Sequence, residues 1–244
     1  MSVFTIADLH LSTSFITNKS MEVFGNRWKD YENKIKINWN RVISPDDTVV
    51  IPGDISWATT INEAKSDFDF IENLNGKKII GKGNHDFWWS TMSKMNLFLK
   101  QNNIKSISFL YNNAFVVEDF IVAGTRGWFY DMDNANVPET SDYQKLISRE
   151  AARLKISLDA ALELKETNKN KEIIVFLHFP PIWNGAEVEE ISDMLSEYEI
   201  KRCYFGHIHG SYNVSPCFNY KNTDYVLISS DYINFIPRIV SPLS

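Results

Sequence analysis

The chain has 244 residues, of which 25 are basic and 31 acidic, and its formal net charge at pH 7 is -6. A hydrophobic fraction of 44% beside a charged fraction of 23% excludes a disordered chain, a collagen-like fibre and a disulfide-rich scaffold. The acidic balance argues against a protein that coats long nucleic acid by bulk charge. Two cysteines are too few for a disulfide framework, which fits a reducing compartment.

The N-terminal residues show no sign of an export signal. They have no basic leader and no long apolar core, and a charged residue already stands at Asp8. No apolar run approaches the ~20 residues that a membrane-spanning helix needs. We therefore expect a cytoplasmic protein without a membrane span, and the sequence leaves its oligomeric state open.

Short apolar runs alternate with segments whose apolar residues recur at helical spacing. The runs are bounded by glycine, proline or aspartate, as strands buried on both faces usually are. No linker rich in Pro, Gly or Ser interrupts them, so we expect one α/β domain over residues 1–244. In chain order the expected elements are strands at 3–7, 48–51, 78–80, 115–123, 173–177 and 201–205, helices at 28–42, 62–74, 87–99 and 141–164, and hairpin strands within 212–239.

Polar motifs follow several of these strands, where open α/β sheets usually place their sites. The motif Gly83-Asn84-His85-Asp86 would arise by chance in roughly one such sequence in 800. All five histidines of the chain fall within the motifs. The motifs are Asp8-Leu9-His10, Gly53-Asp54, Gly83-Asn84-His85-Asp86, His178 and Gly206-His207-Ile208-His209.

The residue types in these motifs suit one kind of site. Two aspartates, one asparagine and four histidines offer a mixed oxygen and imidazole ligand set for two divalent transition ions. Ions about 3.5–4 Å apart can bind both an attacking hydroxide and the phosphoryl oxygens of an in-line displacement. Asp54 has the two oxygens that a bridging ligand needs. The i, i+2 spacing of Asp8 with His10, and of His207 with His209, predicts that each pair shares one side of a strand end.

The five motifs, in this order and with no ligand position substituted, resemble the calcineurin-like metallophosphoesterase family from residue 8 to residue 209. Segments 53–57 and 84–89 also resemble a bacterial branch of predicted phosphohydrolases. The resemblance implies an α/β fold, a four-layer α/β/β/α sandwich of two mixed sheets flanked by helices. It further implies a first metal held by Asp8, His10, Asp54 and His209, and a second held by Asp54, Asn84, His178 and His207.

The resemblance gives His85 a catalytic role rather than a ligand role. We expect it to stabilise the transition state or to protonate the leaving oxygen, with Asp86 orienting its imidazole. Asp86 could also cap the helix expected from residue 87.

The activity implied is a metal-dependent phosphoesterase with a metal-bridging hydroxide, acting on phosphomonoesters or phosphodiesters of small molecules such as a nucleotide. The alternative is a scaffold or binding module that has lost catalysis. We expect Mn as the metal, with Fe, Zn, Co and Ni as alternatives.

Aromatic and basic residues near the motifs have two interpretations each. Trp57, Trp88 and Trp128 could form a rim that stacks on a nucleobase, or they could pack beneath the loops. Arg126 could bind a substrate phosphate through its planar fork or be a plain surface arginine. We expect Lys78 on a solvated face.

Overall fold

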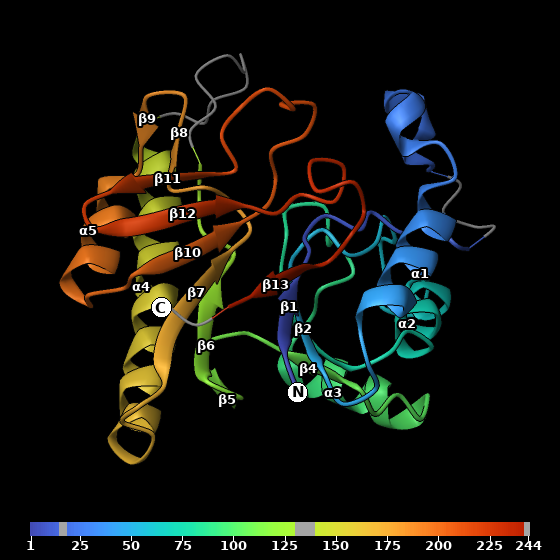
Figure 1. The fold of residues 1–244 in the computed structure, drawn as a ribbon, viewed down its shortest axis with the longest axis horizontal. Helices are drawn as coiled ribbons and strands as arrows, with labels where there is room; N and C mark the ends of the chain where they lie inside the picture. Colours follow the sequence, from blue (N-terminus) through green and yellow to red (C-terminus); the bar gives the residue numbers. More distant parts are fainter. Residues whose placement is uncertain (15–18, 130–139, 242–244) are drawn as a thin grey trace.

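The computed structural model describes residues 1–14, 19–129 and 140–241, and it consists of two facing mixed sheets with helices on the outside (Figure 1). In the first sheet the inner neighbours are parallel and β13 runs antiparallel to β1. Its order is β13 (Arg238–Val240), β1 (Val3–Thr5), β2 (Thr48–Pro52), β3 (Lys77–Gly81) and β4 (Ile107–Phe109).

The second sheet also has a parallel centre, between two antiparallel edge strands. A short hairpin, β8 (Ile182–Trp183) with β9 (Ala186–Glu187), lies apart from it. The order of the second sheet is β11 (Cys217–Tyr220), β12 (Thr223–Leu227), β10 (Arg202–Phe205), β7 (Glu172–Leu177), β6 (Phe120–Thr125) and β5 (Ala114–Val117).

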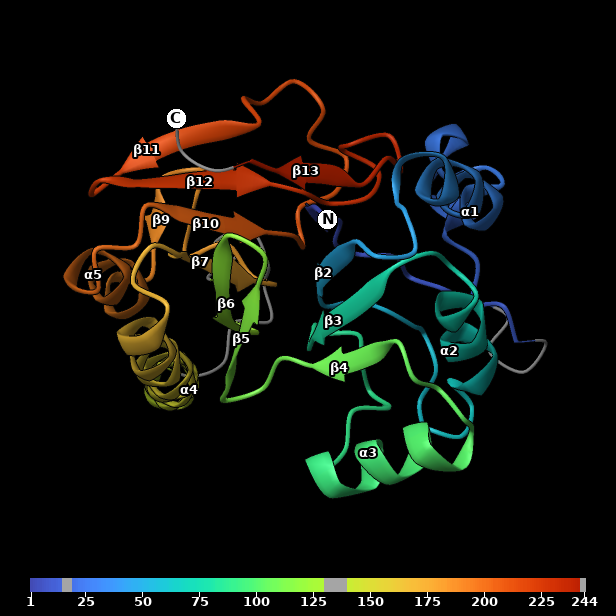
Figure 2. The same ribbon diagram turned by 60° about the horizontal axis from the view of Figure 1, so that its bottom comes forward.

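Helices cover the outer face of each sheet, as Figures 1 and 2 show from two sides. α1 (Tyr31–Val42), α2 (Lys65–Glu72) and α3 (Met92–Gln101) lie beside the first sheet, and α4 (Thr140–Thr167) and α5 (Glu189–Glu197) beside the second. Three apolar clusters separate the layers: one under each set of helices, and one between the sheets that includes Val50, Ile79, Ile174 and Phe176. The expected four-layer α/β/β/α sandwich is confirmed.

Several elements differ from their sequence-based expectations. The run 115–123 is a hairpin of β5 and β6, because the chain reverses at Glu118, which has a φ of +48°. The helix expected from residue 87 begins only at Met92, since the side chain of Thr91 caps it by accepting from the Lys94 N–H. Asp86 therefore does not cap α3. Helix α5 and strand β4 were not predicted.

Lys78 is a further correction, because its side chain is fully buried rather than solvated. Its Nζ donates to the carbonyl of Leu74 and, at 3.1 Å, to Oγ of Ser106. Two hydrogen-bond acceptors thus accompany the charge into the interior, as a buried ammonium group requires.

Within the described ranges, no helix combines the length and the apolar character needed to cross a membrane.

Candidate metal centre

The loops that follow the central strands of both sheets meet at one place and are hydrogen-bonded to one another. The Asp8 N–H donates to the carbonyl of Gly53 at 3.1 Å, and the His10 N–H donates to the carbonyl of Asp54 at 2.9 Å. On the second sheet, the Gly206 N–H donates to the carbonyl of His178 at 3.1 Å. These bonds bring side chains far apart in sequence into one centre.

Two glycines allow the loops to approach this closely. A Cβ on Gly83 would clash with Oδ1 of Asp54, and a Cβ on Gly206 would lie 2.6 Å from Oδ2 of Asp8. Any other residue at these positions would displace an aspartate that faces the centre.

Four of the expected ligand residues have a left-handed backbone. The φ angles are 61° at Asp8, 45° at His10, 52° at Asp54 and 70° at His207. Non-glycine residues hold this conformation at a cost of about 1–3 kcal/mol each, and they do so mainly where the surrounding structure fixes them. Because the chain has left the strands at these positions, strand alternation does not decide where the side chains point.

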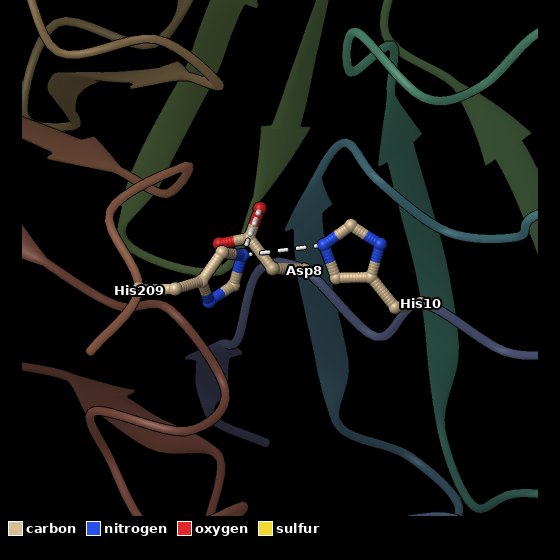
Figure 3. Close-up of side chains that lie close together, drawn as sticks. All are labelled: Asp8, His10 and His209. Atoms are coloured by element: carbon tan, nitrogen blue, oxygen red, sulfur yellow. Dashed lines mark hydrogen bonds and ion pairs between the residues drawn. The ribbon is translucent and has the colours of Figure 1, made fainter. Parts of the chain in front are cut away.

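The first group of possible ligands consists of Asp8, His10 and His209, whose side chains converge in Figure 3. Nε2 of His10 lies 3.2 Å from Nε2 of His209, which in turn lies 4.0 Å from Oδ1 of Asp8. One potential ligand atom from each residue lies within 4.8 Å of the other two, so one ion could contact all three.

The second group consists of Asp8, Asp54 and His178, with Asn84 beside it. Nε2 of His178 lies 2.6 Å from Oδ1 of Asn84 and 3.5 Å from Oδ2 of Asp54. The His207 ring belongs to neither group, and its centroid lies 5.2 Å from that of His178. The backbone N–H of His207 donates to both carboxylate oxygens of Asp8. His207 and His209 therefore face different halves of the centre.

Asp54 connects the two halves through one oxygen. Its Oδ2 lies 3.5 Å from Nε2 of His10 and 3.5 Å from Nε2 of His178. Its Oδ1 accepts the N–H of His85 at 2.8 Å. Oδ2 is thus the oxygen that lies between the two halves, while Oδ1 also accepts a hydrogen bond from the backbone.

The charges in this centre are poorly compensated. Burial raises the pKa of Asp8 to about 6 and raises the pKa of Asp54 well above its usual range. Burial also lowers the pKa of His10 and of His178. Within the described part of the chain, the ion-pair partners of Asp8 and Asp54 are all histidines. Divalent cations would supply the missing positive charge, so the donor set fits a metal centre.

Asp231 completes the centre, although the motifs did not predict it. Its carboxylate lies 2.8 Å from Nδ1 of His209, and it accepts the Gly210 N–H at 3.1 Å and the Tyr212 hydroxyl at 2.9 Å. Although burial opposes the charged imidazole, the hydrogen bond to Asp231 raises the pKa of His209. The only sequence feature that pointed to Asp231 is its position shortly after a strand.

His85 lies beside the first ligand group. Its half-buried ring has its centroid 5.6 Å from that of His10 and 4.5 Å from that of Trp57. The structure thus places the expected catalytic histidine next to the candidate ligands.

Asp86 does not orient the His85 ring in this structure. Its buried carboxylate accepts the N–H groups of Asp54 and Gly83 at 2.9 and 2.7 Å, and the indole N–H of Trp88 at 3.0 Å. Ile55 and Ser56 donate to the same group. Asp86 therefore ties the loop after β2 to the loop after β3, which corrects its expected role.

The tryptophans near the motifs divide into two groups. Trp88 is only 2% exposed and packs against Phe68, so it supports the loops from below and cannot line a substrate surface.

Trp57 is half-buried, and its ring stacks on that of His10 with centroids 4.9 Å apart. Trp28 is buried and packs edge-on against the His209 ring, with the two centroids 5.5 Å apart. Trp128 is half-buried beneath the guanidinium of Arg126.

Comparisons with known proteins agree with this fold. A family model described as calcineurin-like phosphoesterase matches residues 1–211. An uncharacterised protein of Methanocaldococcus jannaschii is 32% identical over 84 residues, which are 34% of this chain and 46% of the relative, so the match spans less than half of that protein.

Two solved structures are similar over nearly the whole chain. The phosphopantetheinyl hydrolase of Mycobacterium tuberculosis has a TM-score of 0.54 at 12% identity, covering 99% of this chain and 96% of its own. The protein TT1561 of Thermus thermophilus has a TM-score of 0.56 at 11% identity, covering 94% and 89%. At these identities the likeness shows the fold.

Proposed function

Because the chain belongs to the calcineurin-like phosphoesterase family, we propose that it is a phosphoesterase that depends on two divalent cations. The observation that carries this proposal is the position of Asp54 Oδ2, which lies 3.5 Å from an imidazole nitrogen on either side. An oxygen in that position can be shared by two ions. The lack of lysine or arginine ion pairs at Asp8 and Asp54, within the described residues, supports it further.

The proposed ligand sets share Asp54. The oxygen and imidazole donors suit Mn, Fe, Zn, Co or Ni, and availability decides which is bound. Two such ions supply a nucleophile at neutral pH and neutralise phosphoryl oxygens. The first ion would be held by Asp8, His10, Asp54 and His209, and the second by Asp54, Asn84, His178 and His207.

We assign His85 a direct contact with the substrate, because its ring lies beside the ligands without belonging to either group. It would contact a phosphoryl or leaving-group oxygen of the bound ester. Trp57 packs against the rings of both His85 and His10, and so limits their movement. Asp86 acts through the loops that it joins and is a positioning residue.

The proposed substrate is a small-molecule phosphate ester. The net charge of -6 disfavours long nucleic acid, whose binding depends on neutralising phosphates with basic side chains. Monoesters and diesters both belong in a substrate panel, and so does a phosphopantetheinyl ester, since the Mycobacterium tuberculosis neighbour is named a hydrolase of that group.

The test is turnover after metal reconstitution. Metal-free protein is loaded with Mn, Fe, Zn, Co or Ni and assayed with 4-nitrophenyl phosphate, bis(4-nitrophenyl) phosphate, nucleotides and a phosphopantetheinyl ester. We expect metal-dependent turnover that Asp54→Asn abolishes and that Asp46→Asn, at an exposed position, leaves intact. Metal binding without turnover of any ester would indicate a binding module instead, and protein that binds no metal would contradict the proposal.

A further inference from the structure

Two arginine side chains pair with one buried carboxylate beside the candidate metal centre, and a lysine lies close to them. Glu150 in α4 has a side chain only 1% exposed, and its Oε1 accepts Nη2 of Arg126 at 3.0 Å and Nη1 of Arg153 at 2.5 Å. Its Oε2 accepts the hydroxyl of Thr125 at 3.1 Å. Glu150 therefore holds both guanidinium groups in place.

Lys82 is the third cation of this cluster. It is half-buried, and its ammonium group lies close enough to Arg126, Arg153, Glu150 and Asp86 to interact with their charges. The nearby carboxylates are Glu150, which already pairs with both arginines, and Asp86, which accepts five hydrogen bonds from the loops. Three cations against these two carboxylates leave about one positive charge uncompensated, in a chain that is acidic overall.

The cluster adjoins the half of the centre that contains Asn84 and His178. Lys82 directly precedes Gly83 and Asn84 in the chain. The carbonyl of Arg126 accepts the N–H groups of His178 at 3.1 Å and of Phe179 at 2.9 Å. The backbones of Lys82 and Arg126 are therefore covalent or hydrogen-bonded neighbours of the proposed ligands.

Some hydrogen-bond donors at this cluster have no partner in the part of the chain that the structure describes. Nε of Arg126 and Nε1 of Trp128 are buried and have no hydrogen-bond partner among the residues that the structure describes. The Arg126 guanidinium lies 5.1 Å from the centroid of the Trp128 ring, so the two donors belong to one place. Buried donors without partners and gathered like charges both cost free energy, and an anion bound there would remove both costs.

We propose that the cluster of Lys82, Arg126 and Arg153 binds a second phosphate group of the substrate. The inference rests on the proposed function: one phosphate is hydrolysed at the metal centre, and the other is held by the cluster. The substrate class is then a small molecule that carries two phosphates, such as a sugar bisphosphate or a nucleoside bisphosphate. Phosphate suits the cluster because the planar fork of arginine matches its oxygens and because an anion compensates the positive charge that the nearby carboxylates leave over.

The experiment compares pairs of substrates that differ by one phosphate. Values of kcat/KM are measured with the Mn-loaded enzyme for AMP and adenosine 3′,5′-bisphosphate, and for glucose 6-phosphate and glucose 1,6-bisphosphate. The variants are Arg153→Met and Lys82→Met, since each leaves Arg126 paired with the buried Glu150. Arg41→Met, at an exposed position in α1, removes the same charge elsewhere and is the matched control.

We expect the wild type to prefer at least one bisphosphate over its matching monophosphate. Both cluster variants should lower that preference about tenfold or more, as expected for the loss of a charged hydrogen-bond partner, and Arg41→Met should not change it. Arg153→Lys, which restores the charge, should recover part of the preference even if Arg153→Met folds poorly. Turnover of 4-nitrophenyl phosphate without any bisphosphate preference, or a preference that both variants retain, would overturn this inference alone. Absence of turnover with every ester would remove the proposed function as well.

Discussion

Asp231 lies 2.8 Å from Nδ1 of His209 and so determines which nitrogen of that ring faces the candidate metal centre. With Nδ1 donating to the carboxylate, Nε2 is left with its lone pair toward Asp8 and His10. Arg27 holds the backbone of Asp231 in place, because its Nε donates to the carbonyl of Asp231 at 2.7 Å. A residue outside the ligand motifs thus presents one of the ligands.

We predict that Asp231→Asn weakens metal binding while leaving the fold intact. Loss of the carboxylate removes the group that fixes the ring and raises the basicity of its ligand nitrogen, and such losses typically cost about 10–100-fold in metal affinity. Titration calorimetry with Mn measures the affinity, and Asp46→Asn is the control at an exposed position. Equal affinities for the wild type and Asp231→Asn would show that the contact has no influence on the metal.

His85→Ala should separate metal binding from turnover. The ring lies beside the ligands but belongs to neither ligand group, so both ions should still bind. Turnover of 4-nitrophenyl phosphate should fall about 10²–10⁴-fold, the usual contribution of a general acid. The measurement is kcat at saturating metal, with metal content determined on the same sample. Full turnover at full metal content would rule out the role assigned to His85.

Metal binding should stabilise the folded chain measurably. Asp8 and Asp54 are buried, and within the described residues they have no lysine or arginine ion pair, so a divalent cation compensates charges that are otherwise unfavourable. Mn at about a hundredfold excess over its Kd should raise the free energy of unfolding by about 2.7 kcal/mol per site. Urea unfolding in Mn and in EDTA measures this difference. An Asp54→Asn variant stabilised by Mn as much as the wild type would contradict the prediction.

The burial of Lys78 predicts an unusual pH dependence of stability. Burial lowers the pKa of Lys78 to about 8 from the ordinary value of 10.5. Between these values the unfolded chain binds more protons than the folded chain, so the contribution of Lys78 to stability increases as the pH rises through this window. The free energy of unfolding of the wild type, relative to Lys78→Met, should therefore be higher at pH 10 than at pH 7.5. A difference independent of pH would show that Lys78 titrates normally.

The residues that follow the strands could be predicted from the sequence, because strand ends and ligand chemistry are both local signals. Four of the residues predicted in this way do lie close together in the structure: Asp8, His10, Asp54 and His178. The layered fold followed from the family resemblance and is confirmed by the two sheets and their helices.

Other features depend on tertiary contacts that local patterns do not contain. Asp231 reaches His209 only because the chain after β12 turns back toward the loop after β10. Asp86 looked like a partner for His85, but the N–H groups of two loops converge on it instead. We expected Lys78 on a solvated face because two adjacent lysines, Lys77 and Lys78, are usually exposed. In the structure its buried ammonium group instead donates to the carbonyl of Leu74 and to the hydroxyl of Ser106.

The central claim is that Asp54 is shared by two metal ions, and electron paramagnetic resonance of the Mn-loaded protein tests it most directly. Two Mn ions that share an oxygen ligand are magnetically coupled, so protein loaded with two equivalents should give the multiline spectrum of a coupled pair. Asp54→Asn should lose that coupling. Wild-type protein that shows only the spectrum of isolated Mn ions at two equivalents would contradict the account.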